Sequence, residues 1–440
     1  MTRLVHRVAR AALAPTILLA VAVALTLPGW RGHYSWATDS VFYEAQTLEL
    51  RGENAASARA QAIAIYARSQ PTTRQLRVFR DQKWVARTAP NYRRRWLVPA
   101  LAAAVYPVFG VKSLLYVSLA GLLAAALLMY VLARMRFGRV ASFSGVAAVL
   151  TLSELPQWSR FPLTDSWGLA LLTAALISGT IVARRGARWL PLWIAVMLAL
   201  SITRDATAIA LAGALGCLVV MRRRQDVWLV LSGAAVAALA PLKFGGSFKS
   251  TLAYDLAGSY PPAHPSWGYD LTKYWPALHG MISTDFGTYV ATPQGRSIAV
   301  IFAAGCVSVA TLGHWSRLKR ERVLLGAVGL GFVALTTILD FAMGGGSPVL
   351  PIGVLLIGAL SALVILWQPD PFFALQAGAA LGALGYLALM PGFTNFRYEI
   401  VLLAAGAVGT AAWVDRLMAG VRSLEREPNR QPVPAAADVS

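Results

Sequence analysis

The stretch that decides the fold is residues 113–133, SLLYVSLAGLLAAALLMYVLA, which is mostly apolar and carries no charged residue. A helix of this length rises about 30 Å, which matches the hydrocarbon core of a bilayer. Other apolar runs approach the same length, at residues 11–29, 164–183, 297–313, 323–339, 349–367 and 372–390. The sequence therefore predicts an all-α, polytopic membrane protein.

The composition excludes several classes of protein. The chain is 57% hydrophobic and 14% charged, and its mean hydropathy is +0.56. Soluble domains carry about 25% charged residues, so a soluble enzyme and a secreted disulfide scaffold are both excluded. Cys217 and Cys306 lie within apolar segments and form no CxxC motif. We therefore expect them to be buried hydrophobic residues and not zinc ligands or redox groups.

The basic residues predict the orientation in the membrane. The net charge is +20, and the cations mostly flank apolar runs, which indicates a lipid bilayer as partner and no nucleic acid. If 11–29 runs outward, six clusters with twenty cations share the cytoplasmic side, while the short outer loops keep only Arg160, Arg204 and Arg397. This split predicts a multi-pass protein of the plasma membrane with cytoplasmic N- and C-termini.

Two apolar stretches do not have the length of a single membrane span. Residues 96–110 are apolar but short, and a full crossing there would invert every later loop, so we expect them to lie in or re-enter the interface. One helix over 189–221 would overshoot the bilayer, so we expect two short helices turning at Arg204-Asp205. About twelve spans result, near 11–29, 113–133, 140–155, 164–183, 189–202, 206–221, 226–243, 297–313, 323–341, 349–367, 371–390 and 398–416.

These spans imply a single transmembrane domain over residues 1–420 with two large outward-facing loops. The loops cover about 30–112 and 244–296, and connections of this length are typically functional. Residues 421–440 are rich in proline and alanine, which predicts a disordered cytoplasmic tail. Arg93, Arg94 and Arg95 in the first loop are expected to anchor 96–110 to anionic lipid, or alternatively to bind a phosphate.

The first outer loop opens with an acid among aromatic residues, HYSWATDSVFYEAQ at 33–46. Asp39 lies just beyond the first span, where a carboxylate is well placed to act as general base for an acceptor hydroxyl. Alternatively, Asp39 or Ser40 caps a helix that starts near Val41, with Glu44 in its first turn. The two roles are compatible, because a cap also fixes the carboxylate.

This arrangement resembles the GT-C superfamily of polytopic glycosyltransferases, such as protein O-mannosyltransferases and lipid A aminoarabinose transferases. The resemblance rests on an apolar first helix, an Asp early in the first outer loop and a long amphipathic loop, and it covers residues 1 to about 420 as pattern and spacing. Three short elements agree with it: RFPLTD at 160–165, SITRD at 201–205 and NFRY at 395–398. The chain departs from the family where Ser40 replaces a frequent second acid and Asp205 a frequent proline.

The resemblance implies an inverting glycosyltransferase that uses a polyprenyl-phosphate sugar donor on the outer face. Asp39 is then the base, and Arg204, Arg397 and Arg160 are candidates for the donor phosphate, because guanidinium groups bind phosphate bidentately. Each of these arginines has an alternative role in snorkelling to lipid headgroups. The candidate supporting residues are Asp165, Tyr43, Glu44, Tyr398 and His279. No cofactor is implied, and a divalent metal near Asp39 and Asp165 is possible but not required.

Two other functions remain open from the sequence. A transporter or flippase of lipid-linked envelope precursors is the main alternative, although such proteins normally place ionisable residues near the membrane midplane and this chain places none there. A non-enzymatic envelope scaffold is the other. The sequence does not specify the sugar, and the acceptor remains an unknown glycan, lipid or protein.

Overall fold

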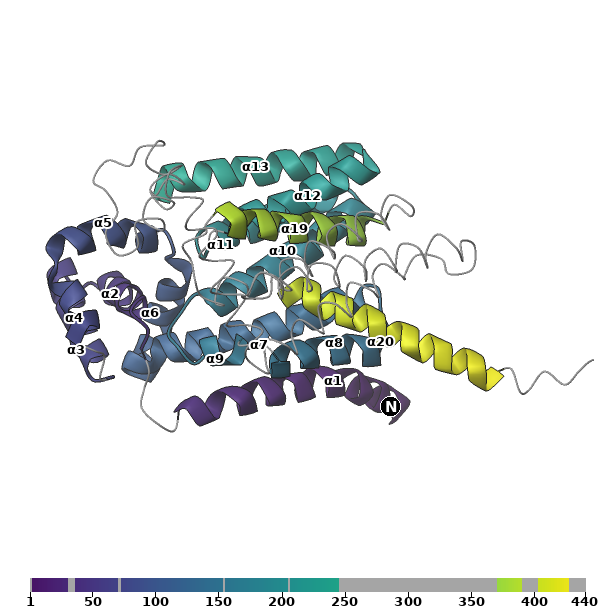
Figure 1. Ribbon diagram of the computed structural model, residues 1–440, viewed down its shortest axis with the longest axis horizontal. Coiled ribbons are helices and arrows are strands. Elements are labelled where there is room, and N and C mark those ends of the chain that lie inside the picture. Colours follow the sequence, from purple (N-terminus) through teal and green to yellow (C-terminus); the bar gives the residue numbers. More distant parts are fainter. Residues whose placement is uncertain are drawn as a thin grey trace, which may run out of the picture.

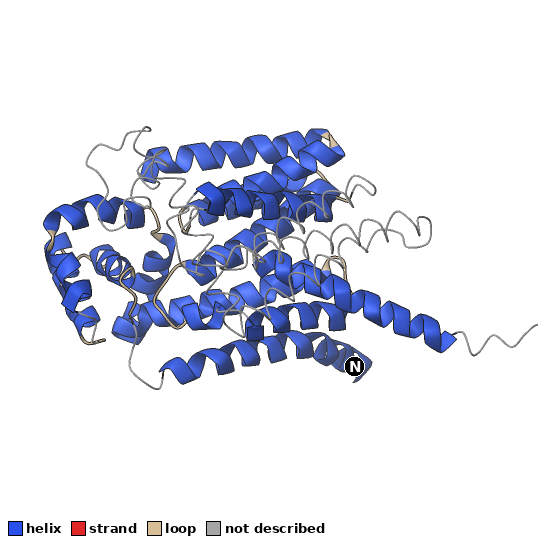
Figure 2. Cartoon of the chain, viewed as in Figure 1, coloured by secondary structure: helices blue, strands red, loops and turns tan. Residues whose placement is uncertain are grey.

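The computed structural model describes residues 2–30, 36–69, 73–152, 155–204, 206–244, 370–389 and 403–426. Within these ranges every regular element is a helix and none is a strand (Figure 2). The predicted all-α class is therefore confirmed for the part of the chain that the structure describes. The expected spans at 297–313, 323–341 and 349–367 lie outside the described residues.

The long helices lie side by side as a bundle (Figure 1). α10 is central, since it packs against α7, α11, α12, α13 and α19. Short 3-10 turns at Leu27–Trp30, Gly110–Lys112 and Ala187–Trp189 join or end some of the helices. The helices of the bundle are α1 (Thr2–Thr26), α7 (Ser113–Arg134), α8 (Arg139–Leu152), α9 (Leu155–Trp158), α10 (Asp165–Arg185), α11 (Leu190–Ser201), α12 (Thr207–Met221), α13 (Arg224–Phe244), α19 (Pro371–Leu389) and α20 (Leu403–Arg426).

The segment that the sequence predicts to face outward folds into five helices, which we call the outer cluster, at one end of the bundle (Figure 1). α6 packs against both α2 and α7 and so joins the cluster to the bundle. Gly110 interrupts the helical course of the chain between α6 and α7. Its φ is +55°, a backbone conformation that favours glycine. The five helices are α2 (Ser40–Leu50), α3 (Ala55–Ala67), α4 (Thr73–Arg80), α5 (Gln82–Arg93) and α6 (Leu97–Phe109).

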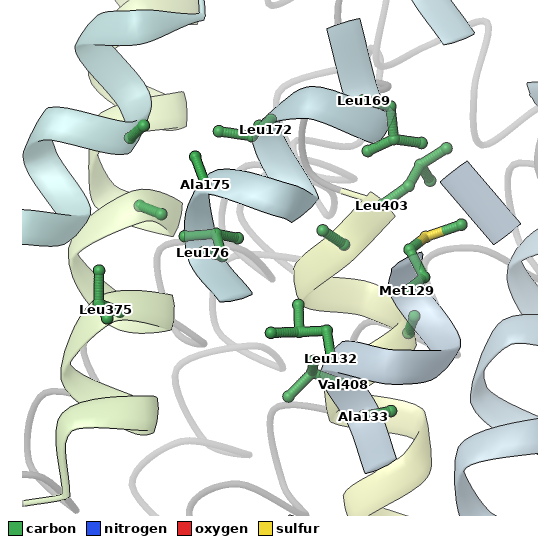
Figure 3. Packing of buried hydrophobic residues seen from close by; sticks show 14 of the residues in the cluster. Met129, Leu132, Ala133, Leu169, Leu172, Ala175, Leu176, Leu375, Leu403 and Val408 are labelled. Carbon is green, nitrogen blue, oxygen red and sulfur yellow. The ribbon is translucent and has the colours of Figure 1, made fainter. Parts of the chain in front are cut away.

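The core of the bundle is made of apolar side chains from helices that are distant in sequence. Figure 3 shows Met129 and Leu132 of α7 close to Leu403 and Val408 of α20, while Leu172 of α10 lies between these helices and α19. All of these side chains are buried. The amphipathic pattern that a soluble helix shows is weak in the bundle, because most of its helices are apolar on every side.

α12 and α19 approach each other most closely through small residues. Gly378 and Gly382 on α19 form a GxxxG pair that faces Ala212 and Gly213 on α12. A Cβ atom on Gly378 would clash with the carbonyl oxygen of Ala212 and lie 3.0 Å from the Cα of Gly213. Small residues at such spacing let helix backbones come into van der Waals contact, which is how helices pair in lipid.

Two helical segments, Leu97–Arg134 and Asp165–Arg185, are long and apolar enough to cross a membrane, judged by length and composition alone. Six shorter apolar helices accompany them in the described residues. Residues 189–221 form two helices, α11 and α12, as the length argument predicted. α20 continues to Arg426, six residues into the segment expected to be a disordered tail, and this corrects the predicted boundary at 421.

The α12–α19 contact gives a testable prediction. Both Gly378→Ala and Gly233→Ala gain helix propensity of about 1 kcal/mol, so their difference isolates the steric effect. At Gly233 the atoms nearest to a Cβ belong to side chains, at 3.3 Å or more, whereas at Gly378 they belong to backbone. We expect Gly378→Ala to be less stable than Gly233→Ala by about 1–3 kcal/mol, as for overpacking. Thermal unfolding of the purified variants in one detergent measures this difference, and equal midpoints would contradict it.

Candidate functional site

Asp39 lies at the start of α2, and its side chain makes no capping hydrogen bond. Its Oδ1 atom instead accepts a hydrogen bond of 2.8 Å from the hydroxyl of Tyr92, at the end of α5. The alternative role that the sequence suggested, a side-chain cap, is therefore not what the structure shows, although α2 does begin at Ser40 as predicted. The carboxyl group of Asp39 is therefore oriented by a residue that lies 53 positions later in the sequence.

Aromatic contacts fix the ring of Tyr92. It stacks on Phe42, with ring centroids 4.5 Å apart and an angle of 2° between the planes. Tyr43 meets it edge-on at 5.5 Å. Offset-stacked and edge-to-face pairs are the favourable geometries for aromatic rings. Phe42 and Tyr43 are consecutive on α2, so the helix that carries Asp39 also holds its hydrogen-bond donor.

A chain of polar contacts links this aromatic group to the bundle. The Nη1 atom of Arg95 donates to the Tyr43 hydroxyl at 3.2 Å, and its guanidinium carbon lies 5.6 Å from the centre of the Tyr92 ring. The Tyr43 hydroxyl is hydrogen-bonded at 3.3 Å to Oγ1 of Thr164, the residue before α10. Arg95 is only 8% exposed, so it points into the protein and not outward as a lipid anchor would.

Asp165 and Arg204 form a buried ion pair next to Thr164. Their Oδ1 and Nη1 atoms are 2.7 Å apart, and the two side chains are 1% and 7% exposed. Gly168 makes room for the pair, because a Cβ atom there would lie 2.8 Å from Cδ of Arg204. Close by, the amide of Leu97 at the start of α6 donates to the carbonyl of Ile202 at 3.2 Å. The structure thus joins two predicted site residues, Asp165 and Arg204, directly.

Arg160 has a different contact. Its Nη2 atom donates at 2.7 Å to the carbonyl oxygen of Leu25, in the last turn of α1. The last carbonyls of a helix have no intrahelical partner, so this bond satisfies one of them. Arg160 therefore ties α1 to the segment that precedes α10.

Glu44 is completely buried between the helices of the outer cluster, and neither of its carboxyl oxygens has a hydrogen-bond partner. Burial raises the pKa of this carboxyl from 4.5 to about 8, although the charge of Arg51 partly offsets the shift. Glu44 is consequently an uncharged acid at neutral pH. The guanidinium of Arg51 itself stacks on the Tyr106 ring at 4.0 Å.

The remaining predicted site residues, Arg397, Tyr398 and His279, lie outside the described residues. The sequence does not indicate Tyr92 or Thr164 as site residues, and it does not predict that Arg95 points inward. A tyrosine beside three arginines gives no local signal, because its partner Asp39 is far away in the sequence. Among the described residues, no three His, Cys, Asp or Glu side chains gather closely enough to hold a metal ion.

Comparison with protein-family models, with curated proteins and with solved structures finds no match to this chain. The site is therefore interpreted from its own chemistry. It offers one half-buried carboxyl with a fixed orientation, one buried arginine on an aromatic platform and one buried ion pair, all where the outer cluster meets the bundle. Such a site can accept a proton and stabilise a negative charge.

Glu44 gives a prediction on stability and pH. The unfolded chain loses this proton near pH 4.5, but the folded protein keeps it until about pH 8. The free energy of unfolding should therefore fall as pH rises between these values, by at most about 1.4 kcal/mol per pH unit, and level off above. Glu44→Gln should remove this dependence, whereas Glu49→Gln, at a half-buried position on the same helix, should keep it. Unfolding midpoints from pH 5 to 9 test this, and an unchanged slope in Glu44→Gln contradicts it.

Proposed function

We propose that this chain is a polytopic membrane glycosyltransferase of the GT-C kind, which moves a sugar from a polyprenyl-phosphate donor to an acceptor on the outer face. The observation that carries the proposal is the Asp39–Tyr92 hydrogen bond of 2.8 Å. It holds a carboxyl group in a fixed orientation at the junction of the outer cluster and the bundle. A residue that served only as a helix cap would bond to the backbone amides of α2 instead.

Asp39 acts as the general base in the proposed reaction. The acceptor hydroxyl oxygen attacks the anomeric carbon of the donor sugar, and its proton passes to the Asp39 carboxylate. The bond from the anomeric carbon to the phosphate oxygen breaks, and the polyprenyl phosphate leaves with the electron pair. Attack from the face opposite the leaving group inverts the anomeric centre. Tyr92 keeps Asp39 aimed at the acceptor.

Arginine stabilises the departing phosphate. Arg204 is the first candidate, because its pairing with Asp165 fixes it near the Tyr43–Thr164 contact. Arg397 is the second, on the sequence pattern alone. Arg95 joins them, since it is buried beside Tyr92 and carries a permanent charge. Arg160 is a further candidate, and one of its guanidinium nitrogens binds the Leu25 carbonyl, as one of those of Arg204 binds Asp165.

The bundle supports the proposed orientation in a membrane. The last turn of α10 contacts the start of α13 through a hydrogen bond from Gln225 to the carbonyl of Ala183, and it contacts the residue before α19 through the Arg184–Asp370 ion pair. The α7–α8 connection contacts the middle of α20, where Asp415 accepts from the amide of Gly138. The basic connections thus gather at the end opposite the outer cluster (Figure 1), and we assign that end to the cytoplasm.

Cysteine labelling tests this orientation. In a background with Cys217→Ala and Cys306→Ala, two exposed alanines serve as a matched pair, Ala56 in the outer cluster and Ala187 between α10 and α11. Ala56→Cys should react with a membrane-impermeant maleimide in intact cells, and Ala187→Cys only after permeabilisation. Labelling of both residues in intact cells, or the reverse pattern, would contradict the proposed orientation.

Removal of the Asp39 charge tests the enzymatic role. We expect Asp39→Asn to abolish transfer, because the base is lost while the shape of the side chain is kept. Asp81→Asn is the matched control, since Asp81 lies in the same cluster and accepts a capping hydrogen bond of 3.1 Å from the amide of Trp84. In a deletion strain, mass spectrometry should show that Asp39→Asn loses one envelope glycan and accumulates its polyprenyl-linked sugar, while Asp81→Asn matches wild type.

The same experiment addresses the alternative functions. A transporter or flippase of lipid-linked precursors, or a scaffold, has no use for a base at position 39. If the Asp39→Asn strain keeps every glycan at equal membrane expression, the transferase proposal is wrong.

A further inference from the structure

Two groups of arginines lie next to each other at the end of the bundle opposite the outer cluster. One group lies where α10 ends and α11 begins, and the other where α12 ends and α13 begins. A hydrogen bond of 2.6 Å from Nε2 of Gln225 to the Ala183 carbonyl joins the two places. We call the combined group the arginine corner, and its members are Arg184, Arg185, Arg188, Arg222, Arg223 and Arg224.

Carboxylates of the described residues balance only part of this charge. Arg184 pairs with Asp370, and Arg223 pairs with the buried Asp226, each at 3.0 Å. Within the described ranges the other four arginines form no ion pair with an acid, and all four are exposed: Arg185, Arg188, Arg222 and Arg224. Guanidinium groups bind phosphate bidentately and stay charged at every pH of interest. The corner is therefore suited to an anionic group that carries more than one phosphate.

α13 leads from the arginine corner into an exposed apolar face. Trp228, Leu231 and Leu239 are 46%, 53% and 62% exposed, and their spacing places them on the same side of the helix as Arg224. α13 lies at the edge of the bundle (Figure 1). A cation, then a tryptophan, then leucines is the order in which a lipid-facing helix passes from headgroups through the interface into hydrocarbon.

α11 offers a second exposed apolar face beside the first. Leu192 and Leu198 are 42% and 48% exposed, and Arg188 precedes them in the chain. α11 packs against α13, since a Cβ atom on Gly233 would lie 3.3 Å from Cζ2 of Trp193. Two neighbouring helices thus each combine exposed arginine at one end with exposed apolar side chains along their length.

We propose that the arginine corner is a binding site for a phospholipid with two phosphate groups, of the cardiolipin type. The exposed arginines before α11 bind one phosphate, and those before and at the start of α13 bind the other. The acyl chains lie along the exposed faces of α11 and α13. A lipid with a single phosphate engages only one of the two arginine groups, so the corner selects the doubly charged lipid. With the orientation proposed above, this lipid belongs to the cytoplasmic leaflet.

Lipid titration of the full-length protein in neutral detergent tests the proposal, with native mass spectrometry to count bound lipids. The probes are cardiolipin and phosphatidylglycerol with the same acyl chains, which differ in the number of phosphates. We expect the first cardiolipin to bind roughly tenfold tighter than phosphatidylglycerol. Inorganic pyrophosphate at the same concentration should not displace it, because it has no acyl chains to bury.

Matched variants locate the site. Arg188→Gln/Arg224→Gln should lose about tenfold in affinity for cardiolipin. Arg136→Gln/Arg139→Gln, which removes the same charge from exposed positions around the α7–α8 connection, should lose twofold or less. Arg188→Lys/Arg224→Lys keeps the charge and should stay within about threefold of wild type. All of these side chains are exposed, so the lipid-free proteins should unfold at the same temperature.

Three outcomes overturn the proposal. Equal affinity for the two lipids shows that the second phosphate is not recognised. Equal losses in the two Gln double variants show a general attraction to the basic end of the bundle and no site at the corner. Displacement of cardiolipin by pyrophosphate shows a site for a soluble phosphate compound instead.

This inference goes beyond sugar transfer, and the two can fail separately. It needs the bundle to lie in a membrane, but it makes no use of Asp39. An active Asp39→Asn protein that still prefers cardiolipin overturns the transferase alone. An inactive Asp39→Asn protein without that preference overturns the lipid site alone.

Discussion

The buried ion pair between Asp165 and Arg204 holds the site to the bundle. It fastens the first residue of α10 to the turn after α11, with 2.7 Å between Oδ1 and Nη1. Removal of one partner from such a pair typically costs about 3–5 kcal/mol, because the other charge stays buried without compensation. Two hydrogen bonds that attach the outer cluster to the bundle lie beside this pair: Thr164 meets Tyr43 of α2, and the Ile202 carbonyl meets the amide at the start of α6. The place of Asp39 relative to the bundle therefore depends on an interaction in which Asp39 takes no part.

Close packing of small residues makes this arrangement possible. Small residues let helix backbones come into van der Waals contact, which is the kind of packing by which helices pair in lipid. α12 and α19 meet through Gly213, Gly216 and Gly378, and Gly145 of α8 lies against the Ala407 carbonyl of α20. Gly168 provides the same kind of space for the Arg204 side chain. The glycines of the bundle thus serve two purposes, since they bring helices together and admit one charged side chain into an apolar core.

The sequence predicts most of the described helices of the bundle, does not predict α3, α4 and α5 of the outer cluster, and predicts the site only in part. Uncharged runs and the bilayer length limit suffice to separate α11 from α12, because one helix over 189–221 would be too long. To predict the Asp165–Arg204 contact, one has to know where α10 begins and where α11 ends. The apolar pattern gives these two boundaries only approximately. The inward direction of Arg95 was beyond prediction, since the three arginines at 93–95 are chemically alike and the local course of the chain after α5 decides which one is buried. Asp39 resembled an N-cap because a competing donor, Tyr92, is visible only in three dimensions.

Asp39, which precedes α2, and Glu44 within it differ enough in their surroundings for only Asp39 of this pair to suit the proposed role of a base. Glu44 is fully buried, uncharged at neutral pH and without a hydrogen-bond partner, so it can neither reach an acceptor hydroxyl nor offer a carboxylate there. Asp39 is half-buried, lies at the end of α2 and already accepts a hydrogen bond from a neutral donor. Both acids belong to one short segment of sequence, and residue type alone does not separate them. The helix does, because it carries Glu44 into the interior of the outer cluster and leaves Asp39 half-buried at its start.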